Sequence, residues 1–457
     1  MKYDVCIVGA GVVGCTLGNV LAKQGRKVLV IERDLEEPDK FIGELLQPGG
    51  VSTLLDLGWP KSAFDEIDSP EISGYALFKD GEEFSIPYEQ IDGKVAIGQG
   101  FRYGRFIGRL RKFLTEQPKV TLVGGKVTSL KEDDERVVGV EYVPNGGAEA
   151  VSVSSSLTVV SDGGYSSFRK GLSNTNREIR SYMLALLLED ADLPYPGHGH
   201  LFICKQPFLA YPVSSRHTRM LIDFPANQPP KKGKELTGFL MSEIRNALPE
   251  RMHLSFDHAV KTYPFKAMPS CEIPANPNRK KGAVLIGDSL NMRHPITGGG
   301  MTVGLADVKF LSDLLAKQED FSDLELLNKI VDEFYDTRHE NVSAVNILAN
   351  ALYKVLSHSE LSQACFDYLG QGGKKASEPI QLLAGISSDR KMLIEHFLAV
   401  AKSGAGKKLK PFPTPERIKA AKNMVGDAID IIEPQLDHEK FGEGLKSLIK
   451  AGKLVTG

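Results

Sequence analysis

Residues 3–14 read Tyr-Asp-Val-Cys-Ile-Val-Gly-Ala-Gly-Val-Val-Gly. The apolar run predicts a short buried strand, and the Gly-x-Gly-x-x-Gly pattern that follows opens a helix ending near Gly25. Gly9 allows the tight turn, Gly11 lets a pyrophosphate approach the backbone, and Gly14 lets helix and strand pack closely. The chain therefore begins with a predicted Rossmann-like dinucleotide-binding unit.

A second apolar run, residues 28–31, predicts the next buried strand, and it ends in Glu32. An acid at this place in the unit suits the ribose hydroxyls of the bound dinucleotide. Because position 32 is acidic rather than Arg, the sequence favours a ribose without a 2′-phosphate, hence FAD or NAD over NADP.

A third segment, residues 287–305, reads Gly-Asp-Ser-Leu-Asn-Met-Arg-His-Pro-Ile-Thr-Gly-Gly-Gly-Met-Thr-Val-Gly-Leu. Asp288 follows the apolar strand 283–286 and is placed to accept from a sugar hydroxyl. The triplet 298–300 is expected to leave backbone N–H groups bare at a helix N-terminus, where the macrodipole favours negative charge. A further Asp-Gly turn begins at Asp162, after a predicted strand, where open α/β sheets bind ligands.

The cofactor segments lie at opposite ends of the first 310 residues, so the nucleotide-binding domain must be discontinuous. We assign residues 1–175 and 262–320 to it, with strands at 120–127, 137–142 and 157–160 and a helix at 106–114. Residues 176–261 predict an antiparallel-sheet substrate domain, with strands at 182–188, 200–204, 208–213 and 220–224. Residues 321–457 predict a helical region, with helices at 324–339, 342–356 and 361–369.

The C-terminal part of the chain contains a Lys/Gly/Pro-rich break at 404–415, followed by predicted amphipathic helices at 418–432 and 441–454. Such helices pack on the protein body or lie in a membrane interface. Their mixed charge signs favour packing, because interfacial helices are usually enriched in cations.

The composition is that of a globular protein: 457 residues, 42% hydrophobic, 25% charged, with a formal net charge of −2. This balance gives no drive toward nucleic acid. The five cysteines are an odd number without metal-ligand spacing, which predicts reduced core residues and no metal site. No apolar run reaches the ~18–20 residues of a spanning helix, and the fingerprint follows Met1 closely, so we expect a soluble or peripheral protein.

Taken together, these motifs resemble squalene epoxidase (squalene monooxygenase), a family of FAD-dependent monooxygenases. The specific strings are Gly-Glu-Leu-Leu-Gln-Pro-Gly-Gly at 43–50 and the segment at 287–304; Ile-Glu-Arg-Asp at 31–34, Gly-Arg-Phe-Ile at 104–107 and Thr-Val-Val-Ser-Asp-Gly at 158–163 accompany them. The resemblance runs in order to about residue 400. It implies a mixed α/β fold: a Rossmann-like FAD-binding domain of the monooxygenase type, an inserted antiparallel-sheet substrate domain and C-terminal helices.

The resemblance also implies roles for individual residues. Glu32 and Arg33 would lie near the adenosine half of FAD, Arg111 and Val127 near its middle, and Asp288 and Met301 near the ribityl chain and ring. Gln47 and Tyr75 would line the substrate cavity beside the flavin and are our catalytic candidates. The predicted cofactor-binding residues are Gly9, Gly11, Val12, Gly14, Glu32, Arg33, Arg111, Val127, Asp162, Asp288, Pro295, Gly298, Gly299, Gly300 and Met301.

The implied reaction is the epoxidation of squalene to (S)-2,3-oxidosqualene through a flavin C4a-hydroperoxide, in sterol or triterpene biosynthesis. Because the cofactor carries this chemistry, no catalytic triad or carboxylate pair is expected. The hydrocarbon would need an apolar tunnel, which residues 200–224, 263–265 and 342–369 could line. His294 and Pro295 would form a stiff wall beside the flavin.

We find no second Gly-x-Gly-x-x-Gly, so electrons from NADPH enter at a transient site or from a partner; the family uses a separate NADPH-dependent flavoprotein reductase. Eukaryotic members are held on the cytosolic face of the endoplasmic reticulum by apolar helices. Here the block after residue 400 is lysine-rich, so we expect membrane contact to be peripheral or lost.

Three alternatives stay open at the level of sequence. In the first, the protein is an FAD monooxygenase that acts on another prenyl or aromatic substrate, and an Arg deep in the cavity would favour this alternative. In the second, it is a flavin- or lipid-binding protein without turnover. In the third, it is an NAD-dependent dehydrogenase, which the string at 287–304 disfavours.

Overall fold

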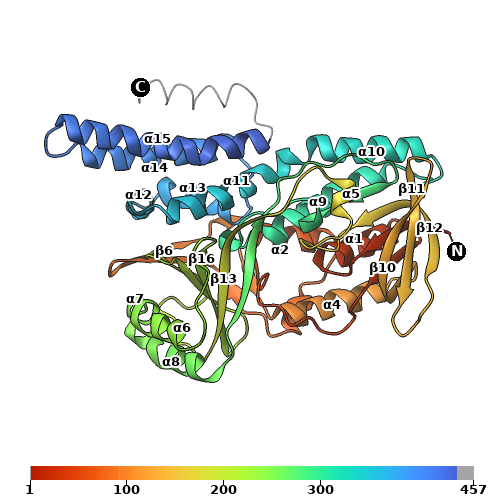
Figure 1. Ribbon diagram of the computed structural model, residues 1–457, viewed down its shortest axis with the longest axis horizontal. Coiled ribbons are helices and arrows are strands. Elements are labelled where there is room, and N and C mark those ends of the chain that lie inside the picture. The colour runs from red at the N-terminus through yellow and green to blue at the C-terminus, as the bar shows by residue number, and fades with distance from the viewer. Residues whose placement is uncertain (1, 92, 440–457) are drawn as a thin grey trace.

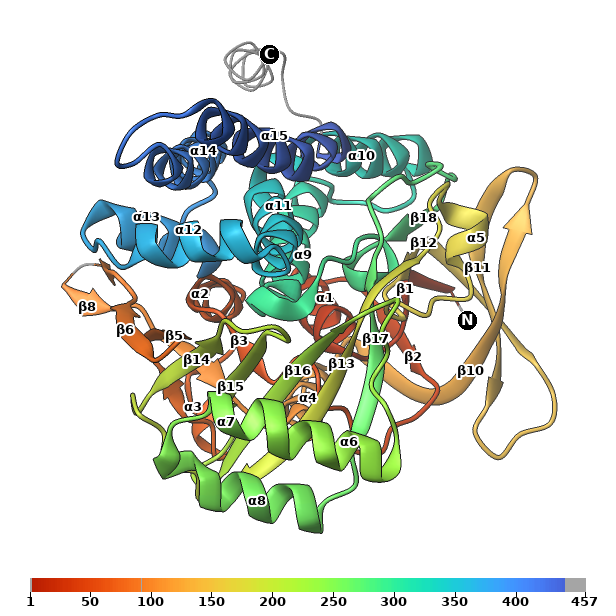
Figure 2. The same ribbon diagram turned by 60° about the vertical axis from the view of Figure 1, so that its left-hand side comes forward.

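The computed structural model describes residues 2–91 and 93–439, and its first layer is a six-stranded sheet (Figure 1). β1 lies between β2 and β12, with β10 and β18 outside them, and all these pairings are parallel. The C-terminal half of β10 and the N-terminal half of β12 pair antiparallel with β11, and this ribbon extends from the body of the protein in Figure 2. The strands are β1 (Lys2–Val8), β2 (Val28–Glu32), β10 (Val120–Asp133), β11 (Arg136–Pro144), β12 (Val151–Val160) and β18 (Ala283–Leu285).

Helices cover the parallel part of this sheet because its strands are apolar on both faces. β1 and β2 contribute almost wholly buried side chains, and α1 (Val12–Lys23) packs between α4 (Tyr103–Thr115) and α9 (Gly300–Ala316). The strand Ala283–Leu285 extends the sheet beside β12, although it follows β12 by more than 120 residues in the chain. The first sheet is therefore built from strands that lie far apart in the chain.

A seven-stranded sheet forms the second layer, in the order β17-β13-β16-β15-β14-β5-β6. The four predicted strands of the insert are present, and all pairings are antiparallel except that of β14 with β5. The sheet also takes in β5, β6 and β17, so it extends beyond the range 176–261 assigned from sequence. Its strands are β5 (Gly74–Lys79), β6 (Glu82–Pro87), β13 (Glu178–Glu189), β14 (His198–Phe202), β15 (Phe208–Pro212), β16 (His217–Pro225) and β17 (Lys266–Glu272).

Both faces of this second sheet are buried in its central strands, whereas most residues of the edge strand β6 are exposed. One face packs on a helical layer formed by α6 (Gly233–Phe239), η1 (Leu240–Ile244), α7 (Arg245–Ala247), η2 (Glu250–Met252) and α8 (His253–Thr262). The other face looks toward the C-terminal helices and toward the loop that carries Gln47. We call this second face the inner face of the substrate sheet.

Short elements join the two layers. They are β3 (Leu45–Leu46), α2 (Pro48–Asp56), α3 (Ser62–Asp65), β4 (Glu71–Ile72), β7 (Gln90–Ile91), β8 (Lys94–Val95), β9 (Gly98–Gly100), α5 (Arg169–Leu172), η3 (Gly287–Ser289) and η4 (Pro295–Thr297). β9 pairs with both β3 and β4.

The C-terminal region is helical, as predicted: α10 (Leu324–Thr337), α11 (His339–Leu356), α12 (Ser359–Leu369), α13 (Lys374–Leu383), α14 (Arg390–Lys408) and α15 (Pro415–His438). The break expected at 404–415 begins too early, because α14 continues through Gly404 to Lys408. A Cβ at Gly404 would lie 2.7 Å from the Cβ of Ala364, so the small residue serves a close helix contact instead of ending the helix.

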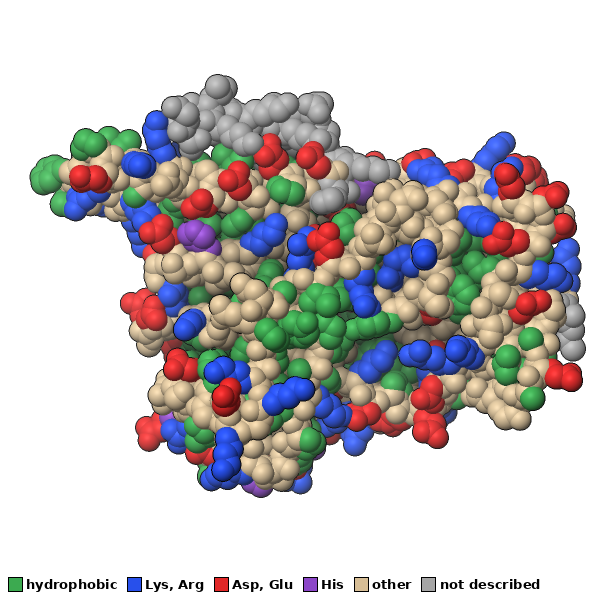
Figure 3. All heavy atoms as spheres, in the orientation of Figure 1, with side chains coloured by type: hydrophobic (Ala, Val, Ile, Leu, Met, Phe, Trp, Pro, Cys, Tyr) green, Lys and Arg blue, Asp and Glu red, His purple; other side chains and the backbone are tan. Residues whose placement is uncertain are grey.

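The helix predicted at 418–432 forms within α15 and packs on the body through Ala421, Ala428 and Ile432, whereas Ile418 is exposed. The helix predicted at 441–454 lies outside the described residues. Within residues 2–91 and 93–439, none of the helices has both the length and the hydropathy that crossing a bilayer requires. Apolar side chains do reach the surface at the end of the α14–α15 pair, where Phe412 is 75% exposed (Figure 3).

Candidate functional site

The turn after β1 has the geometry of a phosphate cradle. Gly9 has φ +100°, a left-handed value that favours glycine, and a Cβ there would lie 2.7 Å from the carbonyl oxygen of Ser161. A Cβ at Gly14 would lie only 2.0 Å from the carbonyl oxygen of Gly9. By contrast, a Cβ at Gly11 would meet no atom within 4 Å. The turn is thus tightly packed at Gly9 and Gly14 and open at Gly11, where an anionic group would approach the N-terminus of α1.

Glu32 and Arg111 meet at this turn, although they come from different elements. The Ala10 backbone N–H donates to Glu32 Oε2 at 2.7 Å, and Arg111 Nε donates to the Ala10 carbonyl oxygen at 3.1 Å. Arg111 Nη2 lies 3.7 Å from Glu32 Oε2. The backbone N–H and the carbonyl oxygen of Ala10 are therefore both bound by side chains that are expected to bind the cofactor.

The Asp-Gly turn after β12 and the Gly-Asp turn after β18 lie side by side, and Arg169 joins them. Its guanidinium donates to the carbonyl oxygens of Gly164, at 3.0 Å, and of Ser289, at 2.8 Å, with longer bonds to Gly163 and Asp288. Sequence reasoning missed Arg169. A lone Arg in a loop carries no recognisable pattern, and only the fold brings its acceptors together.

The two aspartates of these turns suit a hydroxyl-rich ligand. Burial raises the pKa of Asp162, and its Oδ1 has no hydrogen-bond partner although it is buried. Asp288 is exposed on the same edge of the sheet, at the end of β18. One unsatisfied and one exposed carboxylate fit the sugar and ribityl hydroxyls of FAD.

Tyr103, at the start of α4, is a further residue that sequence reasoning missed. Its ring is half-buried, and the pKa of its hydroxyl is raised by burial and by the nearby charges of Asp288 and Glu32. The first and the last cofactor segments do lie close to one another, because a Cβ at Gly287 would lie 2.9 Å from Cγ2 of Val13. No local motif marks Tyr103.

The glycine triplet differs in one respect from the expectation. The turn η4 precedes it, and Gly298, with φ +64°, donates its N–H to the Pro295 carbonyl oxygen at 2.9 Å. The N–H of Gly298 is therefore not bare, because the left-handed residue closes the turn. Gly299 is the N-cap of α9, so free N–H groups are left to the first turn of α9, which includes Gly300 and Met301.

The other predicted cofactor residues differ in their exposure to solvent. Arg33 is exposed, Val127 is half-buried on β10, Val12 is buried at the start of α1, and Pro295 is half-buried in η4. The Arg33 carbonyl oxygen accepts from Asn145 Nδ2 at 3.3 Å, and Val127 packs against the core of the first sheet.

Gln47 and Tyr75, the two catalytic candidates, are hydrogen-bonded to each other. Gln47 Nε2 donates to the Tyr75 hydroxyl at 2.9 Å and to the Thr297 carbonyl oxygen at 2.6 Å. Gln47 Oε1 accepts from the Tyr88 hydroxyl at 2.7 Å. All three side chains are buried, and burial raises the pKa of Tyr75 to about 12. Both candidates thus lie beside the glycine turn, and Tyr88, not recognised from sequence, fixes the Gln47 amide.

An apolar cluster surrounds this polar group on the inner face of the substrate sheet. Its members come from β5, β13–β16 and the helices α11–α13: Tyr75, Leu77, Met183, Leu201, Leu209, Tyr211, Leu221, Ile296, Leu356, Phe366 and Ile380, among others. Residues 263–265 were expected to line the same space, but Tyr263 and Phe265 pack on the opposite face, against α6–α8. Because β17 starts at Lys266, the segment before it lies at the outer edge.

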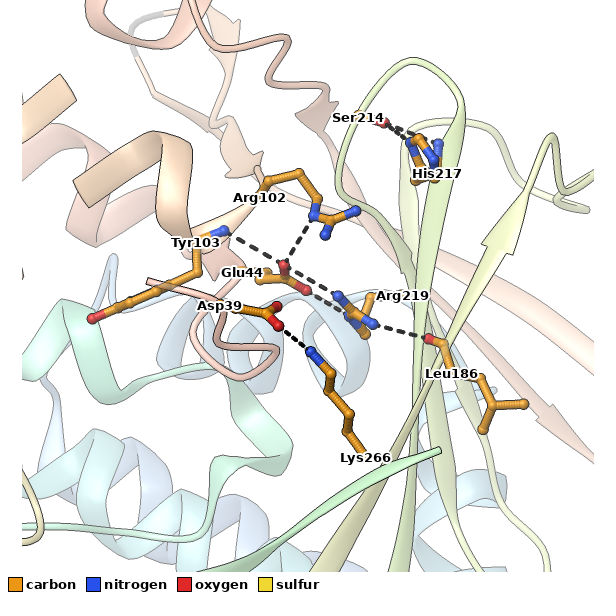
Figure 4. A network of polar contacts seen from close by, with 9 residues as sticks. All are labelled: Asp39, Glu44, Arg102, Tyr103, Leu186, Ser214, His217, Arg219 and Lys266. Carbon is orange, nitrogen blue, oxygen red and sulfur yellow. Dashed lines mark hydrogen bonds and ion pairs between the residues drawn. The ribbon is translucent and has the colours of Figure 1, made fainter. Parts of the chain in front are cut away.

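A buried ion pair connects the substrate sheet to the cofactor side (Figure 4). Glu44 is fully buried, and its carboxylate accepts from Arg219 Nε at 2.6 Å and from the Tyr103 N–H at 3.4 Å. Arg102 Nε lies 3.6 Å away. Figure 4 also shows Asp39 paired with Lys266, a second and more exposed link between the same parts.

A family model and named relatives match most of this chain. The family model described as squalene epoxidase matches residues 154–420, and that of FAD dependent oxidoreductase matches residues 4–39. Squalene epoxidase 3 of Arabidopsis thaliana is 41% identical over 446 residues, covering 95% of this chain and 84% of the relative. The squalene epoxidase of Schizosaccharomyces pombe is 38% identical over 413 residues, covering 88% of this chain and 90% of the relative.

Among solved structures, a flavin-dependent brominase superposes with a TM-score of 0.70 at 20% identity, covering 88% of this chain and 98% of the brominase. This likeness establishes the shared fold. The mixed α/β architecture and the FAD-dependent class expected from the sequence are confirmed. On the extent and identity of these matches, the chain belongs to the squalene epoxidase family.

Proposed function

We propose that this protein epoxidises squalene to 2,3-oxidosqualene, using bound FAD, O₂ and electrons that originate from NADPH. The observation that carries the proposal is the convergence of three distant segments on one edge of the first sheet, directly beside Gln47 and Tyr75. In the overall reaction one oxygen atom enters the alkene and the other leaves as water, with two electrons and two protons supplied by NADPH and a proton.

FAD supplies, when bound and reduced, the activation of O₂ that no protein side chain provides. The chain itself binds and orients. The open backbone at Gly11 and the carboxylate of Glu32 would hold the pyrophosphate and the adenosine ribose. Asp162 and Asp288 would hold the remaining hydroxyls, and the first turn of α9 would face the ring.

Substrate recognition would depend on burial, because a C30 hydrocarbon offers no hydrogen bonds. Burial of each CH₂ is worth roughly 0.8 kcal/mol before ordering costs. The apolar cluster on the inner face provides such an environment and keeps water away from the reacting alkene. Gln47 and Tyr75 are the polar groups at the boundary between this cluster and the glycine turn, so they would orient the reacting end.

The buried Arg219 bears on the alternative of an aromatic or acidic substrate. Glu44 neutralises its charge, and Arg102 adds a second cation to the same carboxylate. A guanidinium already paired in this way is poorly suited to bind a substrate anion. This pairing favours the hydrocarbon over a charged aromatic substrate.

We also propose that a separate NADPH-dependent flavoprotein reductase delivers the electrons and that membrane contact is peripheral. The first point rests on the single dinucleotide fingerprint in the sequence. The second rests on the α14–α15 end, where Phe412 is exposed in the loop that follows α14. An interfacial location on the endoplasmic reticulum would fit the family expectation.

Incubation of the purified protein with squalene, FAD, NADPH and a reductase tests the proposal. We expect 2,3-oxidosqualene that carries one atom of ¹⁸O from ¹⁸O₂. Flavin binding without oxygen incorporation would instead favour a binding protein without turnover. Product from an aromatic substrate, but not from squalene, would favour the other monooxygenase class.

A further inference from the structure

The imidazole of His294 is buried between the substrate sheet and the helices. Its Nε2 lies 2.8 Å from Ser181 Oγ on β13 and 3.3 Å from Asp223 Oδ1 on β16. The ring stacks on Tyr353 of α11, with ring centroids 3.9 Å apart and planes 11° from parallel. His294 therefore contacts both strands and the helix.

The other ring nitrogen of His294 holds a turn. Nδ1 accepts from the Ile296 backbone N–H at 3.3 Å, so His294 caps η4 from its N-terminal side. Because Nδ1 accepts, the proton of the neutral imidazole belongs on Nε2, facing Ser181 and Asp223. The His294 backbone N–H donates to Asn350 Oδ1 at 3.1 Å.

The capped turn carries the carbonyl group that orients Gln47. Thr297, the last residue of η4, accepts from Gln47 Nε2 through its carbonyl oxygen, and Gln47 donates in turn to the Tyr75 hydroxyl. A rotation of η4 would move the Thr297 carbonyl oxygen and release the amide. It would also displace Gly298, which closes the same turn.

We propose that His294 is a positioning residue for the epoxidation. Its Nδ1 sets the turn that orients the Gln47 amide, whereas its Nε2, 2.8 Å from Ser181 Oγ, contributes to the stability of the fold. The inference rests on the proposed function. It assigns His294 to the geometry at the reacting end of the substrate, with no direct part in the chemistry.

Two substitutions separate the two nitrogens. In His294→Asn, the amide oxygen can take the place of Nδ1 and accept from the Ile296 N–H, because Asn is a good N-cap, but the contacts of Nε2 are lost. In His294→Gln, the longer amide reaches toward Asp223 and Ser181, while the acceptor for Ile296 is lost. The Gln variant should therefore be the more stable protein, and the Asn variant should give the higher yield of epoxide.

The measurement is a single turnover of photoreduced holoenzyme with squalene and O₂, in which 2,3-oxidosqualene and hydrogen peroxide are counted per reduced FAD. We expect His294→Gln to lower the epoxide yield about tenfold, with peroxide replacing it, because small displacements at the reacting groups are costly. We expect His294→Asn to stay within about twofold of the wild-type protein. Thermal unfolding of each variant gives the order of stability.

A merely structural role would make epoxide yield follow stability, so the opposite order is the signature of positioning. His294 is not a positioning residue if the Gln variant keeps the wild-type yield, or if the yield of the Asn variant falls as low as that of Gln. His200→Gln is the matched control, since His200 is equally buried but stacks on Phe78 on the other face of the sheet. Its yield per reduced FAD should be unchanged.

If His294→Asn does not fold because the carboxylate of Asp223 is left buried, a double variant that also carries Asp223→Asn removes that charge. We expect this double variant to give the epoxide yield predicted for His294→Asn. The wild-type reaction separates the two hypotheses. Absence of epoxide from the wild-type holoenzyme would contradict the proposed function, whereas a wild-type yield with an unaffected Gln variant contradicts only the role of His294.

Discussion

Arg219 Nε lies 2.6 Å from Glu44 Oε2, and this buried pair joins β16 of the substrate sheet to the segment that leads into Gln47. A second bond, from Arg219 Nη2 to Glu44 Oε1 at 3.3 Å, makes the contact bidentate. Removal of either partner would leave the other charge buried, and among the described residues only the partly exposed Arg102, 3.6 Å away, would remain as a cation for Glu44.

Removal of one partner of this pair should therefore lower the free energy of unfolding more than removal of both partners. Glu44→Gln or Arg219→Met should lower the free energy of unfolding by about 3–5 kcal/mol, and the double variant should recover part of the loss. Urea unfolding gives these values. Asp190→Asn is the control, because it breaks the exposed Asp190–Arg216 pair and should leave unfolding unchanged. A double variant as unstable as the sum of the single variants would contradict the pairing argument.

Gly11 and Gly14 should respond differently to the same added methyl group. Gly14→Ala forces a Cβ against the Gly9 carbonyl oxygen, so the melting temperature of the apoprotein should fall by about 5 °C or more. Gly11→Ala meets no protein atom, so the apoprotein should melt as the wild type does, while the dissociation constant for FAD rises about tenfold or more. Unchanged FAD affinity in Gly11→Ala would show that the dinucleotide does not pass over this turn.

Glu32 should contribute to FAD binding through its charge. Glu32→Gln keeps the shape but weakens the hydrogen bond from the Ala10 N–H and the bond to the ribose, so we expect the dissociation constant for FAD to rise about tenfold. Titration of the apoprotein by quenching of flavin fluorescence measures it. Glu116→Gln, on the exposed end of α4, is the matched control and should bind FAD like the wild type.

Tyr75 should make stability depend on alkaline pH. Burial raises its pKa from 10 to about 12, so the unfolded chain loses this proton first. The contribution to stability is complete below pH 10 and is lost as the pH rises toward 12. Between pH 9 and pH 11 the wild type should lose roughly 1 kcal/mol more than Tyr75→Phe. Urea unfolding at the two pH values measures this difference, and equal losses would mean that Tyr75 is not buried as described.

Much of the fold could be predicted because local pattern was sufficient. The glycine fingerprint, the apolar strands and the helical spacing of the C-terminal region each depend on residues close in sequence. The FAD-dependent class and the family followed from motif strings of the same kind. The break at 404–415 was misplaced for the opposite reason: Gly404 serves a contact with Ala364, which lies 40 residues away.

The site could be predicted only where a motif marks it. No sequence motif marks Arg169, Tyr103 or Tyr88. Arg169 and Tyr88 nevertheless form hydrogen bonds with predicted residues from distant segments, and the charges of two predicted residues raise the pKa of Tyr103. Likewise, no pattern showed that the N–H of Gly298 is used within its own turn.

The sequence by itself determined the elements, the class of cofactor and the family, because backbone conformation and apolar periodicity are local properties. Only the tertiary structure decided which side chains meet. It placed Gln47 against Tyr75 and Thr297, paired Glu44 with Arg219, and set His294 between the substrate sheet and the glycine turn. Contacts between residues up to 250 positions apart depend on how the two sheets pack, and packing is a property of the whole folded chain.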